Sequence, residues 1–177
     1  MGFLSRENVL SLGFQSVGQD VYISDKASFY GTDSICIGNN VRIDDFCIIS
    51  GNVIIGSNVH ISAYSALYGR NGIILSDYSG VSARVTIYSA MDDFSGDYLL
   101  GPVHDTSKTR VFGEKVILGR YTQVGAHSVI FPGVVIGEGS VVGAMSLVKE
   151  SLLPWGIYAG IPSHLIRNRK KGLLKLL

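Results

Sequence analysis

The stretch "IGNNVRIDDFCIISGNVIIGSNVHISAYSAL", residues 37–67, places an aliphatic side chain at every sixth position. A helix would repeat about every 3.6 residues and a half-buried strand about every 2, so neither explains this period. Short parallel strands separated by corners do explain it, because three six-residue units then make one triangular coil. The stretch therefore predicts an all-β solenoid in which each coil hydrogen-bonds to the next and stability comes from stacking.

The same period extends over most of the chain. Two-residue insertions shift it before Ile37 and before Leu75, and it is lost between Ile87 and Leu118. A small or β-branched residue, such as Cys47, follows most aliphatic positions by four. We predict that both sets fill the core, while Gly, Asn and Asp form the corners. The aliphatic positions are Val17, Ile23, Phe29, Ile37, Ile43, Ile49, Ile55, Ile61, Leu67, Leu75, Val81, Ile87, Leu118, Val124, Ile130, Ile136, Val142 and Val148.

The composition limits the classes of protein to consider. The chain has 177 residues, which is enough for one domain. Its net charge of +1 lacks the positive excess expected of a protein that binds nucleic acid. No apolar run reaches the roughly eighteen residues of a membrane span, and the N-terminus lacks the apolar core of a signal peptide. Cys36 and Cys47 are too few for a disulfide framework. We expect a reduced, cytoplasmic protein.

Both ends of the chain are expected to cap the solenoid. Residues 1–16 form an N-terminal capping segment, whose short helix begins with Ser5 as its N-cap. Residues 17–161 form the solenoid domain, and a loop at about 91–115 leaves it. Residues 162–177 are expected to form a basic C-terminal helix that begins at Ser163. Its basic residues suit either a solvated face or a phosphate-binding edge.

The hexads, the excised loop and the ending "VGAHSVIFPGVVIGEGSVVGAMSLVKESLLPWGIYAGIPSHLIR", residues 124–167, resemble the hexapeptide-repeat acyltransferases. More specifically, the chain resembles bacterial sugar acetyltransferases of the galactoside type, many of which serve surface-polysaccharide synthesis, such as that of lipopolysaccharide O-antigen. The resemblance implies a left-handed parallel β-helix, although general crossover rules would favour the right hand. It also implies a homotrimer with active sites between neighbouring chains, and acetyl-CoA as the cosubstrate.

The stretch that breaks the period, "DDFSGDYLLGPVHDTSKTR" at residues 92–110, is expected to be a functional loop. Loops this long in compact domains are usually functional or disordered. In the family that the chain resembles, a loop leaves the coil here, reaches over the neighbouring subunit and helps to enclose the acceptor.

The resemblance does not fix the residue that removes the acceptor's proton. Galactoside-type members carry a catalytic histidine where the loop leaves the coil, and the matching residue here is Asp92. We take His60 as the candidate base, because it ends a hexad on a rigid coil and histidine titrates near neutral pH. Otherwise His60 is a surface or interface histidine. Asp92 and Asp93 are candidates for orienting an imidazole or binding sugar hydroxyls, or are loop-capping residues.

A second group of residues is predicted to form a column at one corner. Phe46, Tyr64 and Arg84 each stand three places after an inward aliphatic residue on successive coils, so they should stack about 4.8 Å apart. Such a column suits a sugar platform with a cation–π contact, or packing between subunits. Tyr64 also matches an acceptor-contact position where galactoside-type members carry asparagine. His104, in the loop, is a further candidate for contact with the substrate.

The resemblance assigns acetyl-CoA contacts to four residues. Ala126 and Gly143 match backbone positions along the pantetheine arm. Lys149 matches a lysine near the adenosine end, and Arg167 matches an arginine that contacts phosphate. His164 stands where a second arginine is expected, which weakens the expected grip on phosphate.

These residues predict an acetyl-CoA-dependent O-acetyltransferase that acts on a sugar in surface-polysaccharide synthesis. The alternative is N-acetylation of a nucleotide-linked amino sugar, because a neutral amine asks less of a protein base and so tolerates Asp92. A carbonic anhydrase of the same architecture needs three zinc-binding histidines, two of them close in sequence, and here no two lie within twenty residues. We therefore expect no metal. A non-catalytic scaffold would need neither the loop nor Lys149 and Arg167.

Overall fold

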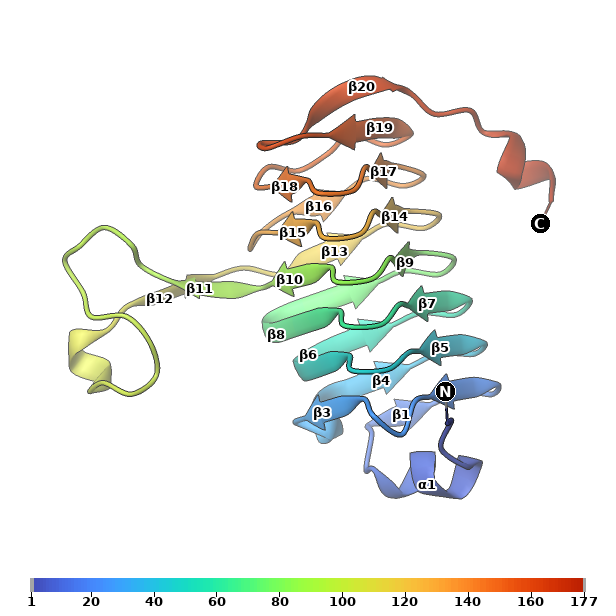
Figure 1. Ribbon diagram of the computed structural model, residues 1–177, viewed down its shortest axis with the longest axis horizontal. Coiled ribbons are helices and arrows are strands. Elements are labelled where there is room, and N and C mark those ends of the chain that lie inside the picture. The colour runs from blue at the N-terminus through green and yellow to red at the C-terminus, as the bar shows by residue number, and fades with distance from the viewer. Residues whose placement is uncertain (1, 177) are drawn as a thin grey trace.

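Three short strands separated by corners make each coil of the protein, as the six-residue period predicts. The computed structural model, which describes residues 2–176, stacks these coils into a parallel β-helix (Figure 1). Equivalent residues of neighbouring coils pair eighteen positions apart where no insertion intervenes, as Ile37 does with Ile55 and Ile43 with Ile61. The solenoid expected from the sequence is confirmed.

One side of the β-helix is an eight-stranded sheet in the order β2-β5-β7-β9-β14-β17-β19-β20. The pairs along it are parallel except the last, in which β19 and β20 are antiparallel. Its strands are β2 (Val21–Ile23), β5 (Val41–Ile43), β7 (Val59–Ile61), β9 (Gly80–Val81), β14 (Gln123–Val124), β17 (Val141–Val142), β19 (Gly156–Ala159) and β20 (His164–Asn168).

The other two sides belong to one ten-stranded sheet, because two long strands bend around a corner and serve both sides. These are β6 (Ile48–Ile55) and β8 (Ala66–Leu75), whose mutual pairing shifts register between Gly51 and Val53. The other strands are β1 (Ser16–Val17), β3 (Ser28–Tyr30), β4 (Ile35–Ile37), β10 (Thr86–Tyr88), β13 (Val116–Leu118), β15 (Val129–Ile130), β16 (Val135–Ile136) and β18 (Leu147–Val148).

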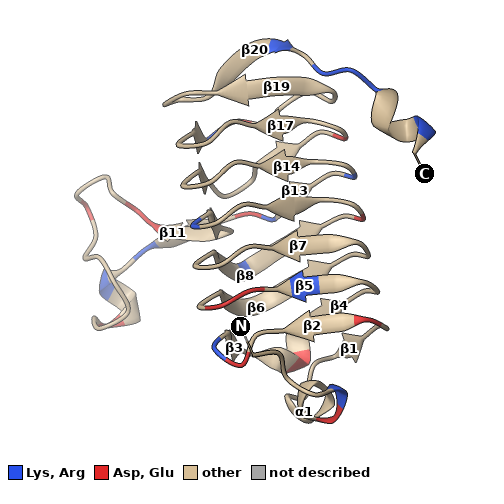
Figure 2. Ribbon diagram, turned by 45° about the vertical axis from the view of Figure 1, so that its right-hand side comes forward, with Lys and Arg blue, Asp and Glu red and all other residues tan. Residues whose placement is uncertain are grey.

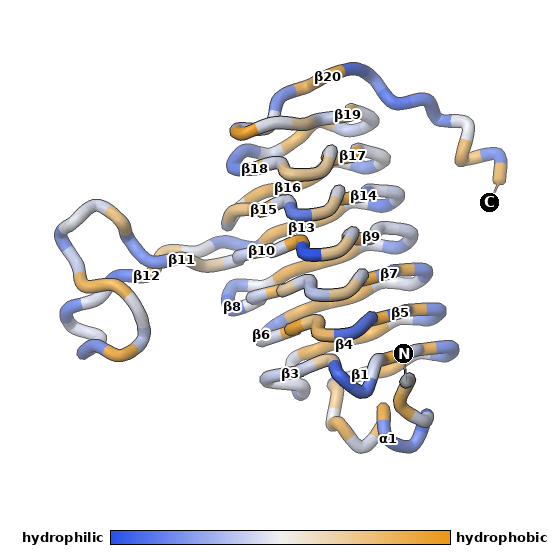
Figure 3. Tube along the Cα trace, viewed as in Figure 1, coloured by the Kyte–Doolittle hydropathy of each residue, from blue (hydrophilic) through white to orange (hydrophobic). Residues whose placement is uncertain are grey.

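The predicted aliphatic positions fill the inside of the coils. The fifteen in-phase positions from Ile37 to Val148 each expose 2% or less of their surface. The small residues that follow them by four are buried beside them, and burial raises the pKa of the Cys47 thiol to about 11. Figure 3 shows apolar segments along the strands and polar ones at corners, while polar and apolar segments alternate in the loop that leaves the coil.

The short N-terminal helix with Ser5 as its N-cap is present, whereas the C-terminal segment differs from expectation. Helix α1 (Arg6–Ser11) begins after Ser5, whose hydroxyl accepts the N–H of Asn8 at 3.2 Å. The helix expected from Ser163 is wrong, because β20 occupies that stretch and pairs with the edge strand β19. Arg169 then donates from Nη1 to the carbonyl oxygens of Tyr121 and Gly139. Short 3-10 helices are η1 (Thr32–Ser34), η2 (Thr106–Lys108) and η3 (Gly172–Lys175).

The interruption of the period is an arm that leaves the coil between β10 and β13. Its base is a pair of antiparallel strands, β11 (Ala90–Asp92) and β12 (Val111–Gly113), and η2 lies in the loop between them. Figure 1 shows the arm projecting from the side of the β-helix. Beyond the arm the coil resumes in register, because Ile87 pairs with Ile130 and Leu75 with Leu118.

Charge is sparse along the coils. Figure 2 shows basic residues on β20 and in the segment that follows it, and charges of both signs in the arm. Within residues 2–176, no helix combines the length and apolar composition that crossing a membrane requires.

A comparison of two neighbouring isoleucines tests the inward rows. Ile55 exposes 1% of its surface and Ile54, beside it on β6, exposes 42%. Ile55→Ala should lower the free energy of unfolding by about 2–5 kcal/mol, because it leaves a cavity inside a coil. Ile54→Ala should cost less than about 1 kcal/mol. Urea denaturation followed by circular dichroism measures both, and equal losses would contradict the assignment of inward and outward positions.

Candidate functional site

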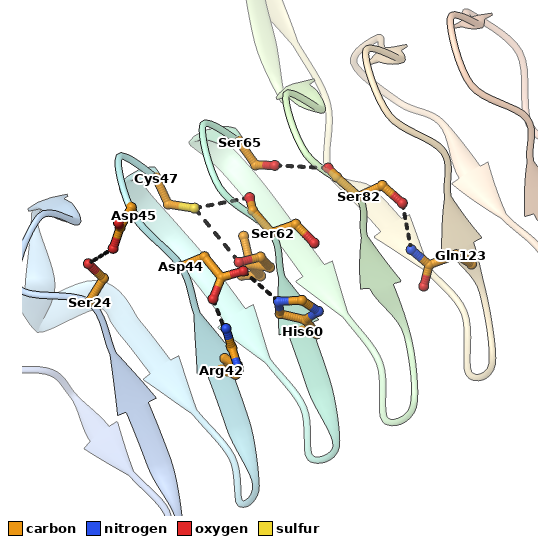
Figure 4. Close-up of polar contacts among 11 residues, drawn as sticks. Ser24, Arg42, Asp44, Asp45, Cys47, His60, Ser62, Ser65, Ser82 and Gln123 are labelled. Carbon is orange, nitrogen blue, oxygen red and sulfur yellow. Dashed lines mark hydrogen bonds and ion pairs between the residues drawn. The ribbon is translucent and has the colours of Figure 1, made fainter. Parts of the chain in front are cut away.

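An ion-paired cluster lies on the outward face of the eight-stranded sheet. His60 projects from β7, and its Nε2 lies 2.8 Å from Oδ2 of Asp44 (Figure 4). Arg42, the in-register neighbour of His60 on β5, donates from Nε to Oδ1 of Asp44 at 2.7 Å. Asp44 itself exposes only 6% of its surface. Both oxygens of this carboxylate are therefore engaged by cationic or hydrogen-bonding side chains.

The partners of Asp44 determine its ionisation and the tautomer of His60. Burial acts to raise the pKa of Asp44, but the hydrogen bonds from Arg42 and His60 outweigh it and hold the pKa below 3.8. An ionised carboxylate only accepts hydrogen bonds, so Nε2 of His60 carries the proton. Nδ1 is then the nitrogen with a free lone pair. This arrangement suits the proton-accepting role considered for His60.

The predicted column at one corner is present. The rings of Phe46 and Tyr64 stack with centroids 4.9 Å apart and planes 23° from parallel. The guanidinium carbon of Arg84 lies 4.8 Å from the centroid of the Tyr64 ring. Lys26 approaches the Phe46 ring from the opposite side, with Nζ 5.7 Å from its centroid. The column is thus an exposed aromatic pair with a cation at each end.

Each member of this corner has a left-handed backbone. Phe46, Tyr64 and Arg84 have φ of 60°, 62° and 61°, and His127 and Met145 continue the corner with 59° and 56°. Bulky residues seldom adopt this conformation, which glycine, asparagine and aspartate tolerate better. Tyr78, Tyr121 and Trp155 have the same conformation at another corner, so this backbone is a feature of the coil and not of the column alone.

A hollow of about 1120 Å³ lies between the arm and the side of the coil. Asp92 and His104 line it from the arm, and Tyr68 and Tyr88, stacked with centroids 5.3 Å apart, line it from the coil. Oδ2 of Asp92 accepts the N–H of Gly101 at 3.1 Å. Within residues 2–176 its other oxygen has no hydrogen-bond partner, so one carboxylate oxygen remains available to a ligand.

Asp93 is engaged within the arm. Its carboxylate accepts the backbone N–H of Ser95, which lowers its pKa, and lies 3.6 Å from Nη1 of Arg110. Its own N–H donates to the carbonyl oxygen of Arg110. These contacts within the arm are the kind expected if Asp93 is a loop-capping residue.

The four residues assigned to acetyl-CoA occupy the C-terminal part of the solenoid. Ala126 precedes the corner residue His127, and its carbonyl accepts the N–H of Met145. Gly143 follows β17, Lys149 is exposed directly after β18, and Arg167 is exposed on β20.

The candidates fall into separate places on one chain. Phe46, Tyr64 and Arg84 share the corner that precedes β10, whereas Asp92 lies beyond β10, where the arm begins. The strand Thr86–Tyr88 therefore separates the column from the cavity. His60 lies on the sheet that leads into the column.

Two outward side chains on the sheet of His60 were missed by reasoning from the sequence. Gln123 of β14 donates from Nε2 to Oγ of Ser82, which follows β9, at 3.2 Å (Figure 4). The strand register could have indicated this contact, because Gln123 pairs with Gly80 on the neighbouring strand, two residues before Ser82. Within residues 2–176, no three His, Cys, Asp or Glu side chains gather as a metal site would need.

Comparison with known proteins identifies the class. The model of the family "Bacterial transferase hexapeptide (six repeats)" matches residues 37–69. A dTDP-4-amino-4,6-dideoxy-D-glucose acyltransferase of Escherichia coli is 42% identical over 179 residues, covering 99% of this chain and 93% of the relative. The galactoside O-acetyltransferase of Escherichia coli K12 is 27% identical over 173 residues, covering 92% and 68% respectively.

A solved relative matches the whole coil and the arm. AntD, an N-acyltransferase from Bacillus cereus, was crystallised with dTDP-4-amino-4,6-dideoxyglucose and coenzyme A. It is 53% identical, with a TM-score of 0.96, and the match covers 98% of this chain and 94% of AntD. Other AntD structures carry replacements of one serine or of one aspartate ten positions further on.

The fold and these matches define an acyltransferase that uses a CoA thioester as its cosubstrate. The chain belongs to the bacterial hexapeptide transferase family, as the resemblance in its sequence implied.

The ion-paired cluster gives a prediction for stability. Asp44→Asn should lower the free energy of unfolding by roughly 1–2 kcal/mol at about pH 7, because it removes the charge that Arg42 and His60 contact. The native pKa of Asp44 lies below 3.8, so its stabilisation is complete above that value and is lost as the pH falls through the native pKa. Urea titrations from about pH 7 to pH 3 should show the difference between variant and wild type shrinking. A constant difference would contradict this account of Asp44.

Proposed function

We propose that the protein transfers an acyl group from CoA to the amino group of a nucleotide-linked amino sugar, with dTDP-4-amino-4,6-dideoxyglucose as the leading acceptor. This replaces the O-acetylation of a sugar that the sequence analysis put first. The relatives at 42% and 53% identity are named for that amino sugar or were crystallised with it, whereas the galactoside enzyme is 27% identical.

The observation in this chain that carries the proposal is Asp92 at the base of the arm. A hydroxyl acceptor needs a base strong enough to take its proton during attack, which is the usual work of a histidine. A carboxylate is a weaker base than imidazole, but it accepts hydrogen bonds from an amine or an ammonium. Asp92, with one oxygen held by Gly101 and the other available, suits an amine.

The AntD variants support a second residue of the proposed site. The replaced serine and aspartate of AntD are ten positions apart, and Ser82 and Asp92 have the same spacing here. Because the AntD match covers 98% of this chain, a small shift in numbering brings the two pairs into correspondence. We assign Asp92 to the amine of the acceptor and Ser82 to the thioester carbonyl that the amine attacks.

A homotrimer would complete each site. Ser82 and Asp92 lie on opposite sides of β10, at two different corners of one chain. We propose that the arm brings Asp92 of one chain to Ser82 of its neighbour, as the family resemblance implies. Exposed apolar residues along the arm give it a surface for such a contact: Phe94, Leu99, Leu100, Val103 and Phe112.

The remaining candidates take roles around this pair. Arg84, which ends the column of Phe46, Tyr64 and Arg84, stands two residues after Ser82. The column offers stacked rings to a nucleotide base and a guanidinium to its phosphates. His60, whose Nε2 faces Asp44, keeps its proposed role as a proton acceptor through Nδ1. The acyl-CoA contacts are assigned, as in the sequence analysis, to Ala126, Gly143, Lys149 and Arg167.

The reaction requires little covalent chemistry from the protein. The amine nitrogen bonds to the thioester carbonyl carbon, the carbon–sulfur bond breaks, and the amine proton ends on the released thiol. The residues above orient the amine and stabilise the negative charge that develops on the carbonyl oxygen.

A matched pair of acceptors tests the proposed function. Free-thiol release is measured with dTDP-4-amino-4,6-dideoxyglucose and with the same nucleotide sugar carrying a hydroxyl at position 4. Acetyl-CoA and 3-hydroxybutyryl-CoA, the latter found with AntD, serve as donors. The amine should give a kcat/KM at least about 100-fold higher than the hydroxyl. Asp92 can accept a hydrogen bond from the amine N–H, but it is too weak a base to take the proton of a hydroxyl. Equal or faster acylation of the hydroxyl would overturn the proposal.

A further inference from the structure

The side chain of Gln123 folds back across the face of the sheet toward Ser82. Its Nε2 donates to Oγ of Ser82 at 3.2 Å and lies 3.5 Å from the carbonyl oxygen of Val124. A carbonyl oxygen only accepts hydrogen bonds, so the nitrogen of the Gln123 amide belongs on this side. Figure 4 shows this contact at Ser82, directly after the C-terminal end of β9.

Gly80 leaves the space in which this amide lies. His60, Gly80 and Gln123 are in register on β7, β9 and β14. A Cβ at position 80 would lie 2.9 Å from Oε1 of Gln123 and 3.1 Å from the carbonyl oxygen of His60. The missing side chain thus allows a glutamine on one coil to reach a serine on the coil before it.

Ser82 differs from the serines that fill the small core positions. Ser65, Ser128, Ser140 and Ser146 each donate their hydroxyl proton to a backbone carbonyl oxygen. Ser82 Oγ accepts from Gln123, and among the described residues it has no bond in which it donates. Its proton is therefore available to a ligand.

We propose that Gln123 is a positioning residue that directs the Ser82 hydroxyl toward the substrate. The inference rests on the proposed function, in which Ser82 faces the thioester carbonyl that the acceptor amine attacks. The Gln123 N–H occupies one lone pair of Ser82 Oγ, so the hydroxyl proton points away from Gln123. Ser82 then presents a donor outward, and a donor aimed at the thioester carbonyl oxygen stabilises the charge that develops there during acyl transfer.

Two substitutions of Gln123 probe the direction of the hydroxyl. Gln123→Ala removes the donor and should lower kcat about five- to tenfold, with the KM of both substrates within about twofold of wild type. Gln123→Glu keeps the shape, but its carboxylate only accepts, so it draws the Ser82 proton away from the substrate. Its kcat should fall further than that of Gln123→Ala. The ratio of its kcat to that of wild type should rise as the pH is lowered from about 8 to about 5, because a protonated carboxyl can donate again.

A double-mutant cycle separates positioning from a merely structural effect. In the Ser82→Ala background, both substitutions of Gln123 should change kcat by less than about twofold, because the hydroxyl they direct is gone. Gln19→Ala, at another exposed glutamine, is the matched control and should leave kcat unchanged. Equal losses in both backgrounds, or a Gln123→Glu loss that does not depend on pH, would overturn the positioning role.

The same experiment distinguishes this inference from the proposed function. If wild type acylates the amino sugar and Gln123→Ala keeps wild-type kcat, the positioning role is wrong and the proposed function stands. If wild type prefers the hydroxyl acceptor, the proposed function is wrong, and the cycle run with that acceptor decides the role of Gln123. A wild-type protein that acylates neither refutes both.

Discussion

The structure depends on one steric constraint: every sixth side chain must fit inside a coil that is only three strands around. Ile43, Ile61 and Val81 lie in register on successive coils, and each packs in a row with those above and below it. Extra residues are accommodated at corners, where they do not disturb the rows. Even the arm obeys this rule, because Ile87 and Ile130 pair across it as neighbours. The interior therefore fixes the position of every outward residue.

The same register places the chemistry. Outward side chains on successive coils form rows of their own, so Asp44 meets His60 and Gln123 meets Ser82 from residues far apart in sequence. The corner that follows these rows has an aromatic and cationic surface. The arm, which begins one side of the triangle further on, places Asp92 beside a cavity. In the proposed function, the rigid coil presents Ser82 and the arm that leaves the coil presents the carboxylate of Asp92.

Features that follow from the period could be predicted, and those that depend on local side-chain geometry could not. Inward positions and the Phe46–Tyr64 stack follow from register alone. The Gln123–Ser82 contact depends on rotamers and on the space left at Gly80, which periodicity does not describe. The segment after Ser163 is a strand and not the expected helix, because it pairs with the edge strand β19. The spacing of apolar residues within that segment does not show that an unpaired strand edge lies beside it. The comparisons support N-acylation, the alternative drawn from Asp92, better than the O-acetylation that the resemblance to galactoside enzymes put first.

Subunit complementation tests most directly whether the site is built from Ser82 of one chain and Asp92 of its neighbour. Ser82→Ala and Asp92→Ala proteins are unfolded together, refolded as mixed oligomers, and assayed by thiol release with the amino-sugar acceptor. If the two residues meet between chains, some sites in mixed oligomers contain both native side chains, and activity should exceed that of either variant refolded alone. If the mixture is no more active than the variants refolded separately, the two residues do not act across an interface and the account is contradicted.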